Sequence, residues 1–152
     1  MNTVLYYSVN GAIYETNAYT AADIDRLIRN QGLQSLTSAD RELDFWFSSS
    51  PQNCQRRINR NATELLLATT NFDVKTVPLL RGCVVVATHD GDGDLDGLSW
   101  QQLERVAERH RTLSQRERRA LNRRILRSDR RHRDADLAQA TFGRLLPALS
   151  RP

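Results

Sequence analysis

The feature that most constrains the fold is an apolar run in the middle of the chain. Gly82 is followed by residues 83–88 (CVVVAT), which are rich in β-branched side chains and do not alternate between apolar and polar positions. A strand with this pattern is covered on both faces of its sheet. The sequence therefore predicts a central strand over residues 83–88, with other elements packed against both of its sides.

The N-terminal sequence predicts a β-hairpin. Residues 4–9 and 12–16 are rich in β-branched and aromatic side chains, and Asn10-Gly11 lies between them. This dipeptide is typical of a two-residue type I′ turn, which needs positive φ at both positions. Pairing across such a turn places one set of side chains on the core side of the hairpin: Leu5, Tyr7, Val9, Ala12 and Tyr14.

Further strands and helices follow from apolar spacing and from residues that begin helices. A strand is expected over residues 43–48, where Trp46 faces away from its two phenylalanine neighbours, and a short one over 72–77. Helices are expected to begin at Thr20 and at Asn59 or Asn61. Because strands and helices do not alternate strictly, the sequence predicts an α+β fold. We expect a small, mostly antiparallel sheet with an N-terminal hairpin and two packed helices, followed by a C-terminal helical extension.

The C-terminal part reads as two or three helices. Ser99 with Gln102, and Ser114 with Glu117, match the capping box that begins many helices. The first of these helices is expected to bury one stripe of side chains: Trp100, Leu103, Val106 and Ala107. The second is expected to bury Leu121 and Ile125. A polar break is then expected over 128–133, before a last helix over 134–146.

Charge is distributed unevenly along the chain. Residues 1–98 hold eight basic and twelve acidic residues, whereas residues 99–152 hold fourteen arginines and six acids. The sequence therefore divides into an α+β domain over residues 1–98 and an arginine-rich helical extension over residues 99–152. A basic extension of this kind either meets an acidic partner, most commonly nucleic acid, or is a solvated helix surface.

A short set of motifs resembles a known domain family. Residues 58–66 (INRNATELL) contain an Asn-Arg-x-Ala-Thr helix start, and residues 81–86 (RGCVVV) place a glycine before the apolar strand and an acidic turn. Over about residues 40–98 these motifs resemble a small domain of unknown function that is common in bacteriophages, plasmids and actinobacterial genomes. The resemblance implies a mobile-element origin and no catalytic residue.

The acidic turn also resembles the opening of a calcium loop. Asp92, Asp94 and Asp96 stand at alternate positions before Gly97, as the first ligands of such a loop do. The twelfth position holds Leu103 instead of a bidentate glutamate, and a strand precedes the loop where a helix is required. A plain strand-to-helix connection is the alternative reading.

No other motif indicates a metal, a cofactor or a catalytic site, and no cofactor is expected. His89, His110 and His132 have no partners at zinc-ligand spacing, and His89 is interpreted as a loop partner of Asp90. The chain has no phosphate-binding glycine loop. Cys83 is expected in the core, and no disulfide with Cys54 is expected in a cytoplasmic protein.

Three functions remain open. The first is a non-enzymatic binding or regulatory module that acts through protein contacts, including contacts with a second copy of the chain. The second is a nucleic-acid-binding protein, and the third is an enzyme of unknown class. For nucleic acid, the candidate residues share helix faces at spacings of three and four: Arg116, Arg119 and Arg123, with Arg105 and Arg109 on the preceding helix.

Two further expectations concern motif and location. Residues 113–118 (LSQRER) resemble the opening of a helix-turn-helix, but no clear second helix with a small residue at the turn follows. No run approaches 18 apolar residues, so no membrane-spanning helix is expected. The first residues lack the pattern of a secretory signal, and a cytoplasmic protein is therefore expected.

Overall fold

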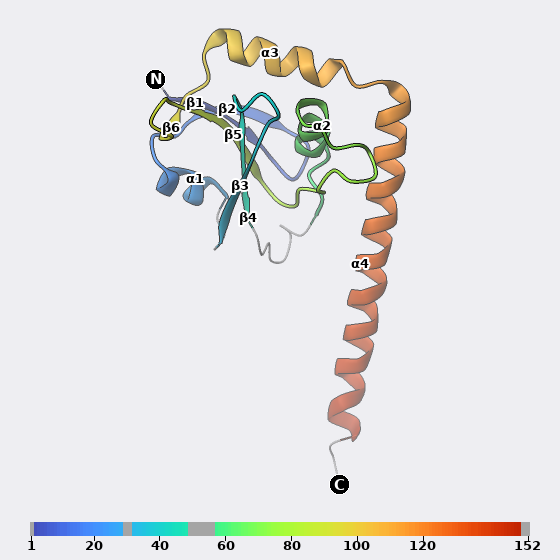
Figure 1. Cartoon of the computed structure of the whole chain (residues 1–152). Helices are drawn as coiled ribbons and strands as arrows, with labels where there is room; N and C mark the ends of the chain where they lie inside the picture. Colours follow the sequence, from blue (N-terminus) through green and yellow to red (C-terminus); the bar gives the residue numbers. More distant parts are fainter. Residues whose placement is uncertain (1, 29–31, 49–56, 150–152) are drawn as a thin grey trace.

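The computed structural model describes residues 2–28, 32–48 and 57–149, and it has an antiparallel sheet with helices on both faces (Figure 1). The elements in chain order are β1 (Thr3–Tyr7), β2 (Ile13–Asn17), α1 (Ala21–Ile28), β3 (Leu33–Thr37), β4 (Asp44–Ser48), α2 (Arg60–Thr69), β5 (Val84–His89), β6 (Leu95–Asp96), α3 (Trp100–Arg111) and α4 (Gln115–Leu149). This arrangement confirms the predicted α+β fold, with its N-terminal hairpin and C-terminal helix.

The apolar run does form the central strand. The strand order is β2-β1-β5-β4-β3, with every pairing antiparallel, and β6 pairs with the end of β5. Val84 and Val86 face a core shared with α2, α3 and α4. Val85 and Ala87 face a second core under α1. Burial on both sides of the sheet therefore accounts for the missing alternation in the sequence.

The N-terminal hairpin forms as expected, but its register differs from the prediction. Ser8 N donates to Ala12 O at 2.8 Å and Gly11 N to Ser8 O at 3.1 Å, so the loop has three residues instead of two. Among the loop residues only Gly11 has positive φ, at 95°. This combination is a type I turn followed by a left-handed glycine. The extra residue shifts the pairing by one, which moves Tyr14 to the opposite face, beside Tyr6.

The middle of the chain differs from the prediction at two places: a strand forms where none was predicted, and a predicted strand does not form. Residues 33–37 form the edge strand β3, whose side chains are mostly exposed. Residues 72–77 form a turn instead of the expected strand. There the Asp73 carbonyl oxygen accepts from the Val77 amide at 2.9 Å, and its carboxylate accepts from the Lys75 amide at 2.8 Å. A local network centred on one aspartate therefore replaces strand pairing at this point.

The sequence predicted where the helices begin, but it did not predict which side chains α3 buries or how far α4 extends. Asn59 caps α2, Ser99 and Gln102 form a capping box on α3, and Ser114 and Glu117 form one before α4. The expected buried stripe of α3 is wrong at its ends, because Trp100 is 72% exposed and Ala107 is also exposed. The expected break over 128–133 is wrong as well. Arginine is a good helix former, and α4 runs without interruption from Gln115 to Leu149.

In the described ranges, no helix combines the length and apolar character needed to cross a membrane.

Candidate nucleic-acid interface

The arginine-rich helices are attached to the body through a buried charge cluster at the turn between α3 and α4. The side chain of Glu64 on α2 is almost fully buried, with Oε2 2.7 Å from His110 Nε2 and Oε1 3.1 Å from Arg60 Nε. Arg118 on α4 places Nη1 3.6 Å from the same carboxylate and donates through Nη2 to His110 O at 2.6 Å. One carboxylate thus connects α2, α3 and α4.

The protonation state of Glu64 follows from this environment. Burial alone would raise the pKa of Glu64, but hydrogen bonds from His110 and Arg60, together with their charges, hold that pKa below its ordinary value. Glu64 is therefore ionised at neutral pH, as an acceptor of several donors must be. An unpaired carboxylate at this depth would be costly, so the cluster exists only with its partners in place.

The inner side of α4 is held against the body by apolar side chains and by one arginine. Leu121 and Ile125 are buried in the main core. Arg124 donates through Nη1 to the carbonyl oxygens of Val74 and Val77, at 3.0 and 2.6 Å. The orientation of α4 about its own axis is consequently set by Leu121, Arg124 and Ile125, together with the ion pair between Arg118 and Glu64.

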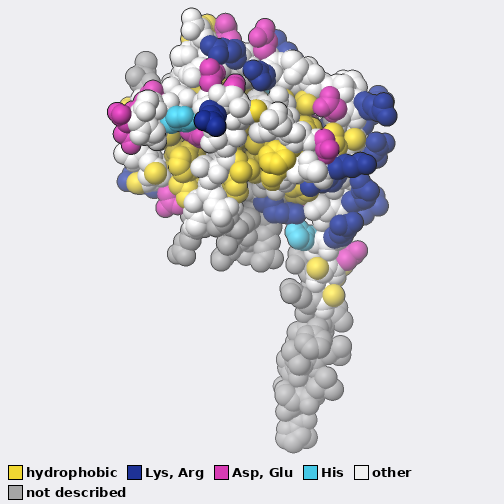
Figure 2. All heavy atoms as spheres, in the orientation of Figure 1, with side chains coloured by type: hydrophobic (Ala, Val, Ile, Leu, Met, Phe, Trp, Pro, Cys, Tyr) yellow, Lys and Arg dark blue, Asp and Glu magenta, His cyan; other side chains and the backbone are white. Residues whose placement is uncertain are grey.

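The outer side of α4 is a continuous basic surface, which we call the arginine face. Its residues are spaced by three or four positions and all are exposed: Arg116, Arg119, Arg123, Arg127 and Arg130. At 100° per residue they lie within an arc opposite the side chains of Leu121 and Ile125. No hydrogen bond or ion pair connects their guanidinium groups to any residue that the structure describes. Figure 2 shows Lys and Arg side chains gathered on the α4 side of the molecule.

The candidate residues from the sequence fall into two groups. Arg116, Arg119 and Arg123 lie together on the arginine face. Arg105 and Arg109 on α3 turn toward the loop between β3 and β4 instead. Arg105 Nη1 lies 3.0 Å from Glu42 Oε2, and Arg109 Nη2 lies 3.7 Å from Asp40 Oδ2. These two arginines are therefore occupied within the chain.

Two members of the arginine face were missed by the sequence analysis. Arg127 and Arg130 flank and enter the segment that was expected to interrupt the helix. Once α4 is read as one helix, the spacing of three and four continues through both residues. The signal was thus present in the sequence but hidden by the wrong helix boundary.

The acidic turn is a β-hairpin loop between β5 and β6, not a strand-to-helix loop. Asp90 Oδ1 accepts from the amides of Asp92 and Asp94, at 2.9 and 3.0 Å. Asp92, Asp94 and Asp96 are exposed. Within the described ranges, no group of three or more His, Cys, Asp or Glu side chains is arranged to hold a metal ion. The turn is stabilised by its own aspartate.

The remaining candidate groups have structural partners. His89 Nδ1 lies 2.7 Å from Asp44 Oδ2, so its partner is Asp44 across the sheet and not the adjacent Asp90. Thr37 also donates to this carboxylate, at 2.9 Å. Cys83 is buried, as expected, and accepts a hydrogen bond from the Tyr6 hydroxyl. Cys54 lies outside the described residues.

Comparisons of this chain with protein-family models, with curated proteins and with solved structures found no match, so the resemblance of residues 40–98 to the phage and plasmid domain family stays a prediction.

Proposed function

We propose that this protein is a non-enzymatic binding module whose arginine face contacts the phosphates of nucleic acid. The observation that supports the proposal is that the arginines of the extension fall into a group with partners in the body and a group without described partners. Those that face the body pair with carboxylates or carbonyl oxygens, and those on the outer side of α4 have no described partner. Such a protein would act in the cytoplasm, and its resemblance to phage and plasmid domains favours a mobile-element origin.

The physical argument is electrostatic. Like charges three or four positions apart on a helix repel one another by a few tenths of a kcal/mol per pair, a cost that a polyanion removes. From Arg116 to Arg130 the helix rises by about 21 Å. A duplex of that length carries about twelve phosphates, so each arginine of the face has phosphates within reach. Contacts of this kind give affinity without reading sequence.

The first experiment measures the salt dependence of binding. Fluorescence anisotropy would follow a labelled random duplex, and a single strand, from about 50 to 200 mM salt. Replacing Arg116, Arg119 and Arg123 with Gln should reduce the slope of log K against log salt by about two to three on the duplex. A control with the same charge change is Arg26→Gln, Arg41→Gln and Arg57→Gln, three exposed residues outside α4, and it should leave the slope unchanged.

A second pair of variants separates the arginine face from net charge. Arg127→Gln with Arg130→Gln should lower the slope by about two. Arg105→Gln with Arg109→Gln changes the net charge equally but removes arginines already paired with Glu42 and Asp40, so the slope should stay the same. Equal effects of the two pairs would mean that only overall charge matters.

The alternative function, binding through protein contacts, is supported by one observation. Two large aromatic side chains are well exposed, Trp100 at 72% and Tyr19 at 61%. Isolated exposed aromatics are common, so this support is weaker than that of the arginine face. Absence of duplex and single-strand binding at about 50 mM salt would replace the nucleic-acid proposal with this one.

A further inference from the structure

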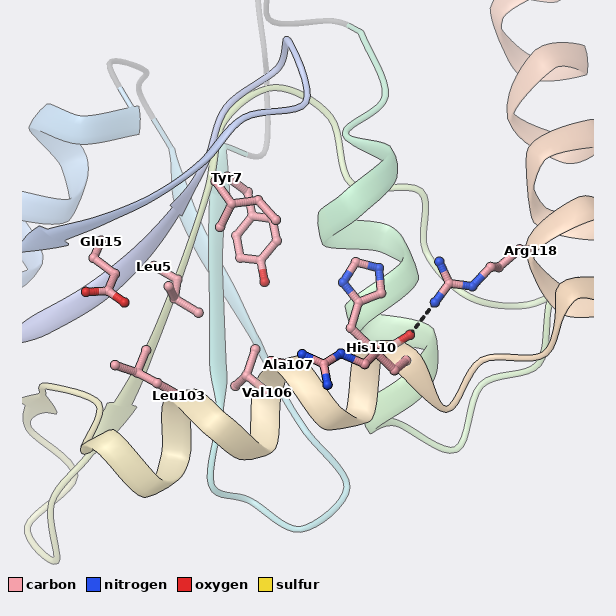
Figure 3. Close-up of a pocket in the computed structure, with 10 residues that line it drawn as sticks. Leu5, Tyr7, Glu15, Leu103, Val106, Ala107, His110 and Arg118 are labelled. Atoms are coloured by element: carbon pink, nitrogen blue, oxygen red, sulfur yellow. Dashed lines mark hydrogen bonds between the residues drawn. The ribbon is translucent and has the colours of Figure 1, made fainter.

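A cleft of about 440 Å³ opens on the far side of α3 from the paired arginines, in the range usual for small-molecule sites. Its walls are the β1–β2 hairpin and α3, and the first turns of α4 close one end (Figure 3). Residues from the hairpin that line it include Leu5, Tyr7, Ile13 and Glu15, and those from α3 include Leu103 and Val106.

The floor and sides of the cleft are apolar. Leu5 and Val106 come from the main core, and Leu103 packs against that core from α3. Ile13 lies opposite Tyr7 in the hairpin and is 45% exposed, because no described helix covers this edge of the sheet. A ligand with an apolar body could therefore bury this surface and contact side chains that are already held in place.

One polar group in the cleft has no described partner. Tyr7 is only 2% exposed, its hydroxyl points into the cleft, and no hydrogen bond joins that hydroxyl to a described residue (Figure 3). Burial raises the pKa of Tyr7, so the group remains an O–H donor at neutral pH. The hydroxyl can therefore donate to a water molecule in the cleft or to an acceptor on a ligand that displaces that water.

The charges of the cleft are separated along its length. His110 and Arg118 lie at the end near α4, and Glu15 lies toward the other end (Figure 3). Arg111, which follows His110 in the chain, also lines the cleft. Arg118 and His110 share the carboxylate of Glu64, whereas Arg111 is exposed and has no ion pair with a described residue. The α4 end is therefore suited to an anionic group, and the Glu15 end disfavours a second one.

We propose that this cleft binds a small organic carboxylate with a single negative charge and an apolar body. The carboxylate lies at the end formed by His110, Arg111 and Arg118, and the body lies against Leu5, Leu103 and Val106. The Tyr7 hydroxyl donates a hydrogen bond to an oxygen of the ligand. This site is separate from the arginine face, which lies on α4 alone.

The test compares three probes of the same shape and different charge: 3-phenylpropanoate, 3-phenylpropanol and 3-phenylpropylamine. Amide chemical shifts of the isotope-labelled full chain would be followed during each titration. The carboxylate should give saturable shifts at Leu5, Tyr7, Ile13 and Val106, and it should bind at least about tenfold more tightly than the amine. Equal affinity for all three probes, or no saturable shift with any of them, would overturn the proposal.

Two variants locate the interactions. Arg111→Gln and Tyr7→Phe should each weaken carboxylate binding by about tenfold, the effect of losing a hydrogen bond to a charged group. Tyr7→Phe keeps the ring and removes a hydroxyl with no described partner, so it should fold with an unchanged melting temperature. Unchanged carboxylate affinity in both variants would show that neither Arg111 nor the Tyr7 hydroxyl contacts the ligand, and would refute the proposed site.

A third variant separates this proposal from the nucleic-acid proposal. The Arg116→Gln, Arg119→Gln and Arg123→Gln triple variant should bind 3-phenylpropanoate as tightly as the unchanged chain does, because none of these residues lines the cleft. Loss of carboxylate binding in the triple variant would show that the probe binds the arginine face instead, and would refute the cleft assignment.

Discussion

At the scale of single residues, Glu64 shows how this fold tolerates a buried charge. The carboxylate lies within 4 Å of three cationic or ionisable side chains, each from a different helix or turn: Arg60, His110 and Arg118. Replacing it with Gln would keep the shape but remove charge-assisted hydrogen bonds to these donors. We expect Glu64→Gln to lower the free energy of unfolding by about 2 kcal/mol in urea denaturation. Glu104→Gln, at an exposed site, is the matched control and should change it little.

The stability provided by Glu64 should depend on pH with a definite sign. Its pKa is lowered in the folded protein from an ordinary value of 4.5. Its contribution is therefore complete above that value and is lost as the pH falls through the lower, folded-state pKa. Below the ordinary value, the difference in unfolding free energy between the unchanged chain and Glu64→Gln should shrink as the pH falls. A difference that grows as the pH falls below 4.5 would contradict this assignment.

Gly11 provides the positive φ that the turn of the first hairpin requires. Its φ is +95°, and a Cβ atom built there would meet nothing within 4 Å. Gly11→Val should therefore destabilise the protein by more than about 1 kcal/mol through the backbone alone. Gly91 is also in a hairpin loop with open space around it, but its φ is not in the left-handed region. An equal loss of melting temperature for Gly11→Val and Gly91→Val would refute the assigned turn.

At the scale of elements, the sequence predicted what is encoded locally. The caps at Asn59, Ser99 and Ser114 each depend on residues within three positions of the cap. The sequence identified Ser99 and Ser114, and it left Asn59 as one of two candidates with Asn61. The register of the first hairpin depends on loop length, and Asn-Gly fits both a two-residue and a three-residue loop. The edge strand Leu33–Thr37 shows little apolar alternation because most of its side chains are exposed. Its pairing with β4, which is a tertiary contact, is what makes it a strand.

The acidic turn provides a prediction for a whole loop. Asp90 already accepts from the Asp92 and Asp94 amides, and Asp96 accepts from the Gly97 amide at 2.8 Å. With these carboxylates used to hold the turn and Leu103 in place of a bidentate glutamate, we expect no micromolar calcium site. A micromolar site would add about 4 kcal/mol of stability in 1 mM calcium. Thermal melts with and without calcium should therefore coincide, and a rise of several degrees would contradict this expectation.

At the scale of the molecule, part of the positive charge of the extension is neutralised by acidic residues of the first 98 residues. The acidic residues Asp40, Glu42 and Glu64 of the first 98 residues pair with arginines of the extension. The sequence could predict the excess of arginine but not this pairing, which depends on loops that meet only in the folded structure. The arginine face stays without a described partner, and the candidate nucleic-acid site therefore holds fewer arginines than the composition of the extension implied.

The last prediction concerns the part of α4 that leaves the body. Ile125 is the last buried side chain among the described residues, and residues 130–135 are all exposed. Figure 1 shows α4 extending beyond the rest of the fold. Ending the chain after Arg133 keeps Ile125, the Arg81–Ser128 hydrogen bond and the whole arginine face. We therefore expect the shortened chain to lose helical circular dichroism but to melt within about 3 °C of the full chain, since little burial is lost. The full chain should also melt at a temperature independent of its concentration. A large drop in melting temperature on shortening, together with concentration dependence in the full chain, would instead show that the end of α4 packs against a second copy.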